Sequence, residues 1–251
     1  DGVGSRPDDI LAAFQAERGT VSGGMNHDMS GMGGMGDSPL GDVGDIAYPH
    51  YLINGRVPAA PSTLTAKPGQ RARIRLINAA ADTLFRLALG EHTMTVTHTD
   101  GFPVQPVETR ALYLAQGERV DVLVTLGDGV FPLVAHAEGK DGQGLALMRT
   151  GAGSRPAADV HPSELDSGPL LLATLMPAES ARLPGREPDQ VEQVTLNGQM
   201  RPYAWGMNGT TFGSDTPIRT SAGRRLRLQM TNMTMMAHPM HIHGHTWSMP
   251  G

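Results

Sequence analysis

The chain has 251 residues, of which 39% are hydrophobic, and a formal net charge of −5 at pH 7. This length and composition allow one large or two ordinary globular domains with real hydrophobic cores. The negative charge, with arginines dispersed along the chain, excludes a nucleic-acid-binding surface. The longest apolar run, PLLLATLM at 169–176, is too short to span a membrane. The absence of cysteine excludes disulfides, zinc ribbons and iron–sulfur clusters.

The first 45 residues predict little folded structure. Residues 8–16 (DDILAAFQA) have the spacing of one short amphipathic helix. The stretch 19–42 is too rich in glycine, serine and aspartate to bury a core, and it predicts a loop or a disordered segment. We therefore assign residues 1–45 to an interdomain segment with a short helix and a Met/Gly-rich loop.

Residues 46–150 predict a β-sandwich. In RARIRLIN (71–78) apolar residues alternate with arginines, which is the period of a half-buried strand with a solvated face. Six further segments have strand character: LFRLAL, HTMTVTHT, TRALYLA, RVDVLVTL, GVFPLVAHA and LALMRT. Seven or eight short strands in about 105 residues are typical of an antiparallel sandwich. Glu118, Arg119 and Asp121 are expected to form ion pairs and a turn within it, and not an acid–base site.

Residues 151–190, rich in Pro, Ala, Ser and Gly, predict an interdomain linker. Strand-like sequence resumes from residue 191 and continues to residue 251.

An internal repeat relates the two strand-rich regions. Residues 61–78 resemble residues 216–232 at a constant offset, because Gly69 matches Gly223 and Asn78 matches Asn232 (223 − 69 = 154 and 232 − 78 = 154). At the same offset, three histidines of the second copy correspond to leucines of the first: His238, His241 and His243 to Leu84, Leu87 and Leu89. We infer two copies of one β domain, of which the second covers only about the first half.

Residues 238–245 (HPMHIHGH) hold four of the ten histidines. Imidazole is the commonest protein metal ligand, and it favours zinc, copper, iron or nickel. His241 and His243 would project to the same face of a strand, whereas His238, next to Pro239, would point elsewhere. The spacing predicts two separate metal sites that share one short segment. The interleaved Pro, Ile, Gly and Trp disfavour a histidine-rich tag.

HPMHIHGH resembles the HPxHxHGH segment of multicopper oxidases, which are built from cupredoxin-like Greek-key β-sandwiches. The resemblance implies that His238 binds a type 1 copper, His241 the type 2 copper and His243 a type 3 copper of a trinuclear cluster. It assigns no catalytic residue beyond the copper ligands, and it does not make His245 a ligand. YPHYLINGR, THTDGFPV and GERVDVLV resemble the middle, copper-free domain of three-domain bacterial enzymes. The expected fold is all-β, with one complete cupredoxin copy at 46–150 and a partial, copper-binding copy at 191–251.

The sequence also departs from the family pattern. A type 1 site needs a thiolate, and the family supplies it from a downstream HCHxxxH segment, with two HxH pairs in a further upstream domain. We therefore expect this chain to be part of a larger oxidase and to be inactive alone. The half-domain would be completed by missing segments or by a second copy of the chain. The resemblance implies a parent enzyme that oxidises a reducing substrate, Cu(I) or phenols, and reduces O₂ to water.

The expected location is periplasmic or extracellular. The chain begins at Asp1 without a basic-then-apolar leader, so any signal peptide would have been removed or would lie upstream.

The Met/Gly-rich loop is a second candidate copper site. Its thioethers suit Cu(I), and it resembles the methionine-rich inserts of copper-resistance oxidases. The alternative is a tolerated low-complexity loop. The possible Cu(I) ligands are Met25, His27, Met29, Met32 and Met35.

Two other functions stay open. One is a non-catalytic cupredoxin-type copper-binding or storage module, and the weaker one is a two-domain copper nitrite reductase, which the copper-free leading copy disfavours. The isolated histidines are expected to be hydrogen-bonded or solvated and not ligands: His50, His92, His98, His136 and His161.

Overall fold

The structure is a computed structural model, and it describes residues 6–16, 38, 40–41, 43–44, 46, 48–199, 203–211, 213–214 and 216–249. The chain divides into two compact units. Unit 1 takes in Gly31–Leu183 and Pro239–Gly251, and unit 2 takes in Val3–Ser30 and Pro184–His238. None of the described helices has the length and apolarity that a membrane span requires.

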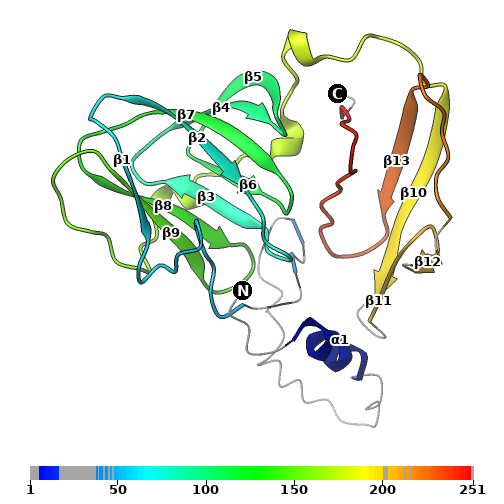
Figure 1. Ribbon diagram of the computed structural model, residues 1–251, viewed down its shortest axis with the longest axis horizontal. Coiled ribbons are helices and arrows are strands. Elements are labelled where there is room, and N and C mark those ends of the chain that lie inside the picture. The colour runs from blue at the N-terminus through cyan, green and yellow to red at the C-terminus, as the bar shows by residue number, and fades with distance from the viewer. Residues whose placement is uncertain are drawn as a thin grey trace. The chain divides into compact units, whose positions relative to one another are not determined.

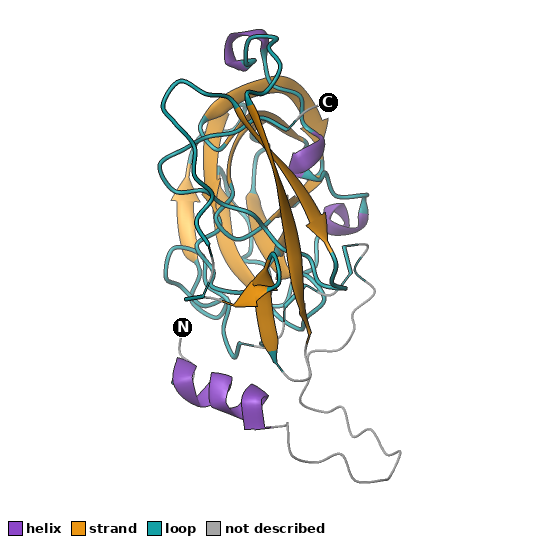
Figure 2. Cartoon of the chain, turned by 90° about the vertical axis from the view of Figure 1, so that its right-hand side faces the viewer, coloured by secondary structure: helices purple, strands orange, loops and turns teal. Residues whose placement is uncertain are grey.

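Unit 1 contains two β-sheets. The first has the order β1 (Ser62–Thr65), β9 (Gln143–Arg149), β8 (Val130–Ala137), β3 (Phe85–Leu89) and β6 (Ala111–Leu114). The second has the order β2 (Arg71–Ile77), β7 (Arg119–Thr125), β4 (Met94–Thr99) and β5 (Phe102–Thr109). Neighbouring strands are antiparallel except for the parallel pair β1 and β9. Figure 2 shows that strands and loops dominate the chain and that its helices are short, so the all-β prediction is confirmed.

All seven predicted strand segments form strands, but β1 and β5 were not predicted. β5 contains Pro103 and Pro106, and proline cannot donate a hydrogen bond to a neighbouring strand. Its place at the edge of the second sheet tolerates both residues, because only one side of β5 pairs with another strand of the sheet. β1 is four residues long and mostly exposed, so its sequence carries little apolar alternation.

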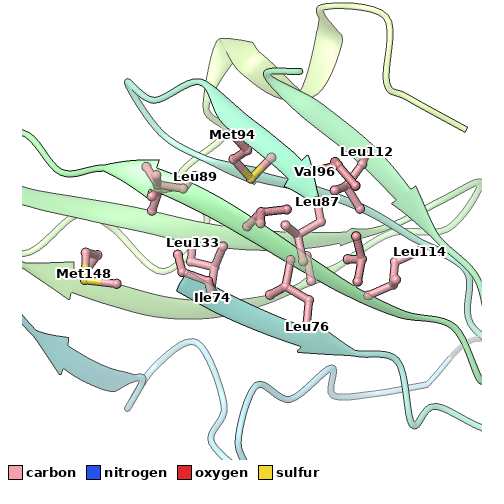
Figure 3. Close-up of a cluster of buried hydrophobic side chains, with 14 of the residues drawn as sticks. Ile74, Leu76, Leu87, Leu89, Met94, Val96, Leu112, Leu114, Leu133 and Met148 are labelled. Carbon is pink, nitrogen blue, oxygen red and sulfur yellow. The ribbon is translucent and has the colours of Figure 1, made fainter. Parts of the chain in front are cut away.

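The core of unit 1 lies between the two sheets. Ile74 and Leu76 of β2 are buried, while the arginines that alternate with them are exposed. Figure 3 shows Ile74 and Leu76 lying among the side chains of Leu87 and Leu133. The three leucines that correspond to the histidines of the second copy are 7%, 4% and 0% exposed, in the order Leu84, Leu87 and Leu89. These positions therefore contribute to the apolar interior of unit 1.

The charged residues of the GERVDV segment have structural partners. Asp121 on β7 lies 3.6 Å from Arg73 and 3.4 Å from Arg75 on the adjacent strand β2. Arg119 pairs with Asp100 at 3.0 Å, and the Glu118 carboxylate accepts the Ala115 N–H at 2.7 Å. Burial raises the pKa of Glu118. The prediction of ion pairs and a turn is confirmed.

Part of the predicted linker packs along the edges of unit 1. It contains three short 3-10 helices, η2 (Ser163–Asp166), η3 (Leu172–Thr174) and η4 (Glu179–Ala181). Leu165 and Leu172 are buried. Leu170 forms a β-bridge with Leu112 of β6, and Pro177 forms one with Val104 of β5. Residues 163–178 therefore belong to the folded body of unit 1.

Unit 2 contains the helix α1 (Pro7–Ala16), which confirms the predicted helix, and one sheet. Its strand order is β12 (Thr210–Thr211), β11 (Ala204–Met207), β10 (Gln190–Gln199) and β13 (Leu226–Asn232). The long strands β10 and β13 run parallel, side by side (Figure 1). Their register brings Val194 next to Met230 on one face, and the alternate face carries Gln193 paired with Gln229. The sheet thus has one apolar face and one polar face.

Candidate metal centre

The histidine segment follows the end of β13. The described residues after Asn232 contain no β-strand, and a turn lies at His243–Gly244, where Gly244 has φ 75°. The expectation that His241 and His243 lie on a strand is therefore wrong. Pro239 lacks the N–H that regular pairing needs, and a left-handed glycine turns the chain.

The rings of His241 and His243 nevertheless lie next to each other. Their centroids are 4.8 Å apart, and the ring planes meet at 83°. Both residues are exposed. The described part of the chain has no group of three or more His, Asp or Glu side chains that could hold a metal ion. The pair therefore offers two imidazole ligands, and a complete centre needs further ligands.

His238 has different surroundings. It is half-buried, and its Nε2 lies 2.8 Å from the Thr234 hydroxyl oxygen. The Trp205 ring packs against it at 5.5 Å between centroids, with an angle of 66° between the planes. Burial lowers the pKa of His238. Burial therefore favours the neutral ring, which is the form that binds metals.

The sheet of unit 2 positions Trp205. The antiparallel register of β10 and β11 places Trp205 opposite Gly198. A Cβ atom on Gly198 would overlap Cε3 of the Trp205 ring and would lie 2.8 Å from the Ala204 carbonyl oxygen. Gly198 therefore leaves the space in which the indole lies.

The repeat is visible in local structure. Gly69 and Gly223 both have left-handed φ angles, 73° and 81°. Asn78 and Asn232 both accept, through Oδ1, the backbone N–H two residues ahead, at 2.9 Å in each copy.

Thr234, whose hydroxyl contacts His238, was not predicted as a site residue. Its signal was present in the repeat, because alanine stands at the corresponding position 80 (234 − 154 = 80).

The remaining histidines are hydrogen-bonded, packed against another ring or exposed. The buried His92 is hydrogen-bonded through both ring nitrogens, to Gly90 O at 2.7 Å and to the Gly127 N–H at 3.0 Å. His136 and His161 are not isolated, because their ring centroids lie 5.8 Å apart. His245 is exposed, with Nδ1 3.4 Å from the His243 carbonyl oxygen.

Three of these histidines have polar partners or are exposed to solvent. His161 also pairs with Asp166 at 2.9 Å, while His98 contacts the Thr97 hydroxyl at 3.1 Å and His50 is exposed. The possible Cu(I) ligands of the methionine-rich loop lie outside the described residues: Met25, His27, Met29, Met32 and Met35.

Comparison with protein families identifies both halves of the chain. A family model described as multicopper oxidase matches residues 35–153, and a second model with the same description matches residues 185–251. The chain belongs to the multicopper oxidase family. Copper is the cofactor that this family implies, as predicted. The His238, His241 and His243 imidazoles fit copper as part of a ligand set, whereas the thiolate of a type 1 centre has no source in this chain.

Named relatives agree with the family. The chain is 52% identical over 209 residues to multicopper oxidase MmcO of Mycobacterium tuberculosis, covering 83% of this chain and 42% of that protein. It is 26% identical over 302 residues to a copper resistance protein A homolog of Pseudomonas syringae pv. tomato, covering 85% and 51%. The chain thus spans about half the length of the curated relatives it matches.

Solved structures support the fold. A variant of the McoA multicopper oxidase from Aquifex aeolicus matches with a TM-score of 0.55 and 19% identity, covering 82% of this chain and 47% of that one. A multi-copper oxidase from Pseudomonas thermotolerans matches with a TM-score of 0.50 and 22% identity, covering 77% and 44%. The prediction of a cupredoxin-like fold is confirmed.

Proposed function

We propose that this multicopper oxidase chain supplies imidazole ligands to the copper centres of a laccase-like oxidase. The observation that carries the proposal is the HPMHIHGH segment, which lies within the second region matched by the family model. His238 serves a type 1 copper, His241 the type 2 copper and His243 a type 3 copper. Copper held in part by these three imidazoles would supply one-electron chemistry, through which electrons from a reducing substrate would reduce O₂ to water.

The residues around each imidazole support these roles. His238 is held from two sides, by the Thr234 hydroxyl and by the Trp205 ring. A ligand with few rotational alternatives binds a metal with less loss of entropy. The His241 and His243 ring centroids lie 4.8 Å apart, so the two imidazoles are close enough to serve neighbouring metal ions. Such a pair suits a cluster in which neighbouring ions take separate ligands.

The proposed domain organisation follows from the distribution of ligands. Residues 46–150 form a copper-free cupredoxin domain, in which leucines occupy the histidine positions. Residues 191–251 form part of a copper-binding cupredoxin domain, and residues 1–45 are an interdomain segment. Residues 151–190 are a linker, of which residues 163–178 pack against the first domain. Because the chain has no cysteine, the type 1 thiolate comes from outside it. Additional segments, or a second copy of the chain, complete the second sandwich.

The proposed substrate is Cu(I), with phenols as the alternative. Four methionines between residues 25 and 35 support Cu(I), because thioethers bind it well. Two relatives are named copper resistance protein A homolog and copper resistance protein A, whereas Laccase-2 of Podospora anserina is 26% identical over 76% of this chain. We propose a periplasmic or extracellular location, where copper export and copper tolerance would use such an activity.

The decisive experiment uses the complete reading frame that contains this chain. We expect it to encode an HCHxxxH segment downstream and two HxH pairs upstream, and its product to consume O₂ with Cu(I) or a phenol. His241→Ala and His243→Ala should each abolish O₂ consumption, and His238→Ala should remove the blue absorption band. His245→Ala is the matched control and should retain activity. A reading frame without the cysteine segment, or equal damage from His245→Ala, would contradict the proposal.

The isolated chain provides a second measurement. Without a thiolate, it should show no intense blue absorption after copper is added and should consume no O₂. Light scattering should detect association of copies if a second chain completes the half-domain. A strong blue band from the chain alone would refute the ligand assignment.

A non-catalytic copper-binding or storage module is the second candidate. The observation in its favour is the set of four methionines between residues 25 and 35, whose thioethers suit Cu(I) binding. Such a module would bind Cu(I) in its complete form and would consume no O₂ with any reducing substrate. The O₂ measurement on the complete protein therefore separates the two functions.

A further inference from the structure

The turn between β13 and His238 contains a hydrogen-bond chain whose direction can be worked out. The backbone N–H of Thr234 donates to a side-chain atom of Asn232 at 2.9 Å. A backbone N–H can only donate, so that atom is the amide oxygen Oδ1. The other amide atom, Nδ2, then donates to the Met236 carbonyl oxygen at 2.8 Å. Both contacts require the same orientation of the Asn232 amide.

This orientation determines where the Thr234 hydroxyl proton goes. The hydroxyl oxygen lies 2.8 Å from Asn232 Oδ1, which can only accept, and 3.2 Å from the Met236 carbonyl oxygen, which can also only accept. The single hydroxyl proton therefore points to one of these two oxygens and away from the histidine. The Met236 N–H donates to the hydroxyl oxygen at 3.2 Å. The oxygen is left to act as an acceptor toward His238 Nε2 at 2.8 Å.

We propose that Asn232 and Thr234 fix the neutral ring of His238 in its Nε2–H tautomer, so that Nδ1 is the nitrogen presented to a metal. A neutral imidazole carries one hydrogen, and the partner of one ring nitrogen decides the state of the other. No described residue forms a hydrogen bond with His238 Nδ1. Among the described residues nothing competes with a metal for the Nδ1 lone pair, and Thr234 acts as a positioning residue for the ligand.

The first copy of the repeat is an internal control for this inference. Asn78 forms the same turn, with its Oδ1 accepting the Ala80 N–H at 2.9 Å. At the position of Thr234 this copy has Ala80, and at the position of His238 it has Leu84 (238 − 154 = 84). The hydroxyl is thus present in the copy that has an imidazole to orient, and absent from the copy that has none. The turn itself needs only the asparagine.

The inference rests on the proposed function only where it assigns Nδ1 to a metal. The tautomer itself can be measured in the metal-free chain. We suggest two-bond ¹H–¹⁵N correlation spectra of the metal-free chain, labelled at histidine, at a pH of about 8.5, where an ordinary histidine is neutral. Signals of His238 are assigned with a His238→Gln variant. His92 is a reference of the opposite type, because its Nδ1 faces a carbonyl oxygen and its Nε2 accepts an N–H. We expect His238 to show the Nε2–H pattern and His92 the Nδ1–H pattern.

Substitutions test the role of the hydroxyl. Thr234→Val should expose the His238 Nε2–H to rapid exchange with water, so that its proton signal is lost. Thr234→Ser should retain the signal, and so should the matched control Thr231→Val on β13. An Nδ1–H pattern at His238 in the unaltered chain would overturn the inference without any variant. An unchanged exchange rate in Thr234→Val would overturn it as well.

A copper titration separates this inference from the proposed function. Loss of a partner that orients a metal ligand typically weakens metal binding by about 10–100-fold. We expect that loss when the complete protein carries Thr234→Val and is titrated with Cu(II), and recovery with Thr234→Ser. The predicted tautomer in a complete protein that binds no copper through His238 would support the inference and overturn the copper role.

Discussion

Asn78 and Asn232 occupy equivalent turns, one buried and one exposed. Replacing each by aspartate measures how much burial increases the stability that such a turn contributes. Asn78 is 4% exposed. Its Nδ2 donates to the carbonyl oxygens of Thr83 at 2.9 Å and Leu114 at 2.8 Å, and its Oδ1 accepts the Ala80 N–H at 2.9 Å. Asn78→Asp keeps the shape and the acceptor but removes both donors, so two buried carbonyl groups lose their partner.

The expected cost follows from those two groups. A buried polar group left without its partner costs about 1–3 kcal/mol, so two cost about 2–6 kcal/mol. For a unit of this size, each kcal/mol lowers the melting temperature by about 2–4 °C, which gives a decrease of at least about 4 °C. Ionisation of the new carboxyl group would increase the loss, because a buried charge without a partner is unfavourable.

The control is Asn232→Asp. Asn232 is exposed and its Nδ2 donates one hydrogen bond, of 2.8 Å, to the Met236 carbonyl oxygen, so the expected cost is at most about 1 kcal/mol. Hydrogen–deuterium exchange measured by mass spectrometry follows the two units separately, through peptides from 71–149 and from 190–232. Equal destabilisation by the two variants, or no faster exchange in unit 1 of Asn78→Asp, would refute the reasoning from burial.

Three further predictions test packing and charge. Lys140→Ala should destabilise the chain by about 3–5 kcal/mol in thermal unfolding, because it leaves Asp82 without its partner. The two side chains form an ion pair of 2.7 Å in which the lysine is 2% exposed. The double variant Lys140→Met with Asp82→Asn should recover most of the lost stability. Burial raises the pKa of Glu164, but hydrogen bonds from backbone N–H groups and an arginine outweigh it and hold the pKa below its ordinary value. The resulting stability is present above a pH of about 4.3 and is lost as the pH falls through the lower folded pKa, so Glu164→Gln should flatten the acid limb of stability against pH. Gly198→Ala should displace the Trp205 ring, costing about 1–3 kcal/mol and shifting tryptophan emission to longer wavelength, and unchanged emission would contradict this packing.

The sequence predicted those strands of unit 1 in which burial alternates. β7 alternates half-buried and buried residues along most of its length, as expected for a strand with one face in the core. β5 escaped prediction because its prolines are acceptable only at a sheet edge, and edge position depends on the complete sheet. The parallel pairing of β1 with β9 joins residues 62–65 to residues 146–149. No local pattern in a four-residue strand specifies such a distant partner.

Residue type and spacing predict candidate ligands, but they did not predict the local geometry of the histidine segment. Residue type and spacing identified His238, His241 and His243 as candidate ligands. Their assignment to a strand was wrong because Pro239 and the left-handed Gly244 prevent regular pairing. Trp205 could not have been placed beside His238 from sequence, since its position depends on the register between β10 and β11.

The two asparagine turns have the same backbone hydrogen bond, but their side chains have different further partners. In the first copy, the Asn78 amide ties the end of β2 to the Leu114 carbonyl of β6, which strengthens a buried core. In the second copy, the Asn232 amide instead directs a hydroxyl proton away from His238. The same turn therefore stabilises a fold in one copy and orients a candidate ligand in the other. Two side chains distinguish these uses, a hydroxyl and an imidazole, so the two copies can share a turn although only one of them carries a candidate ligand.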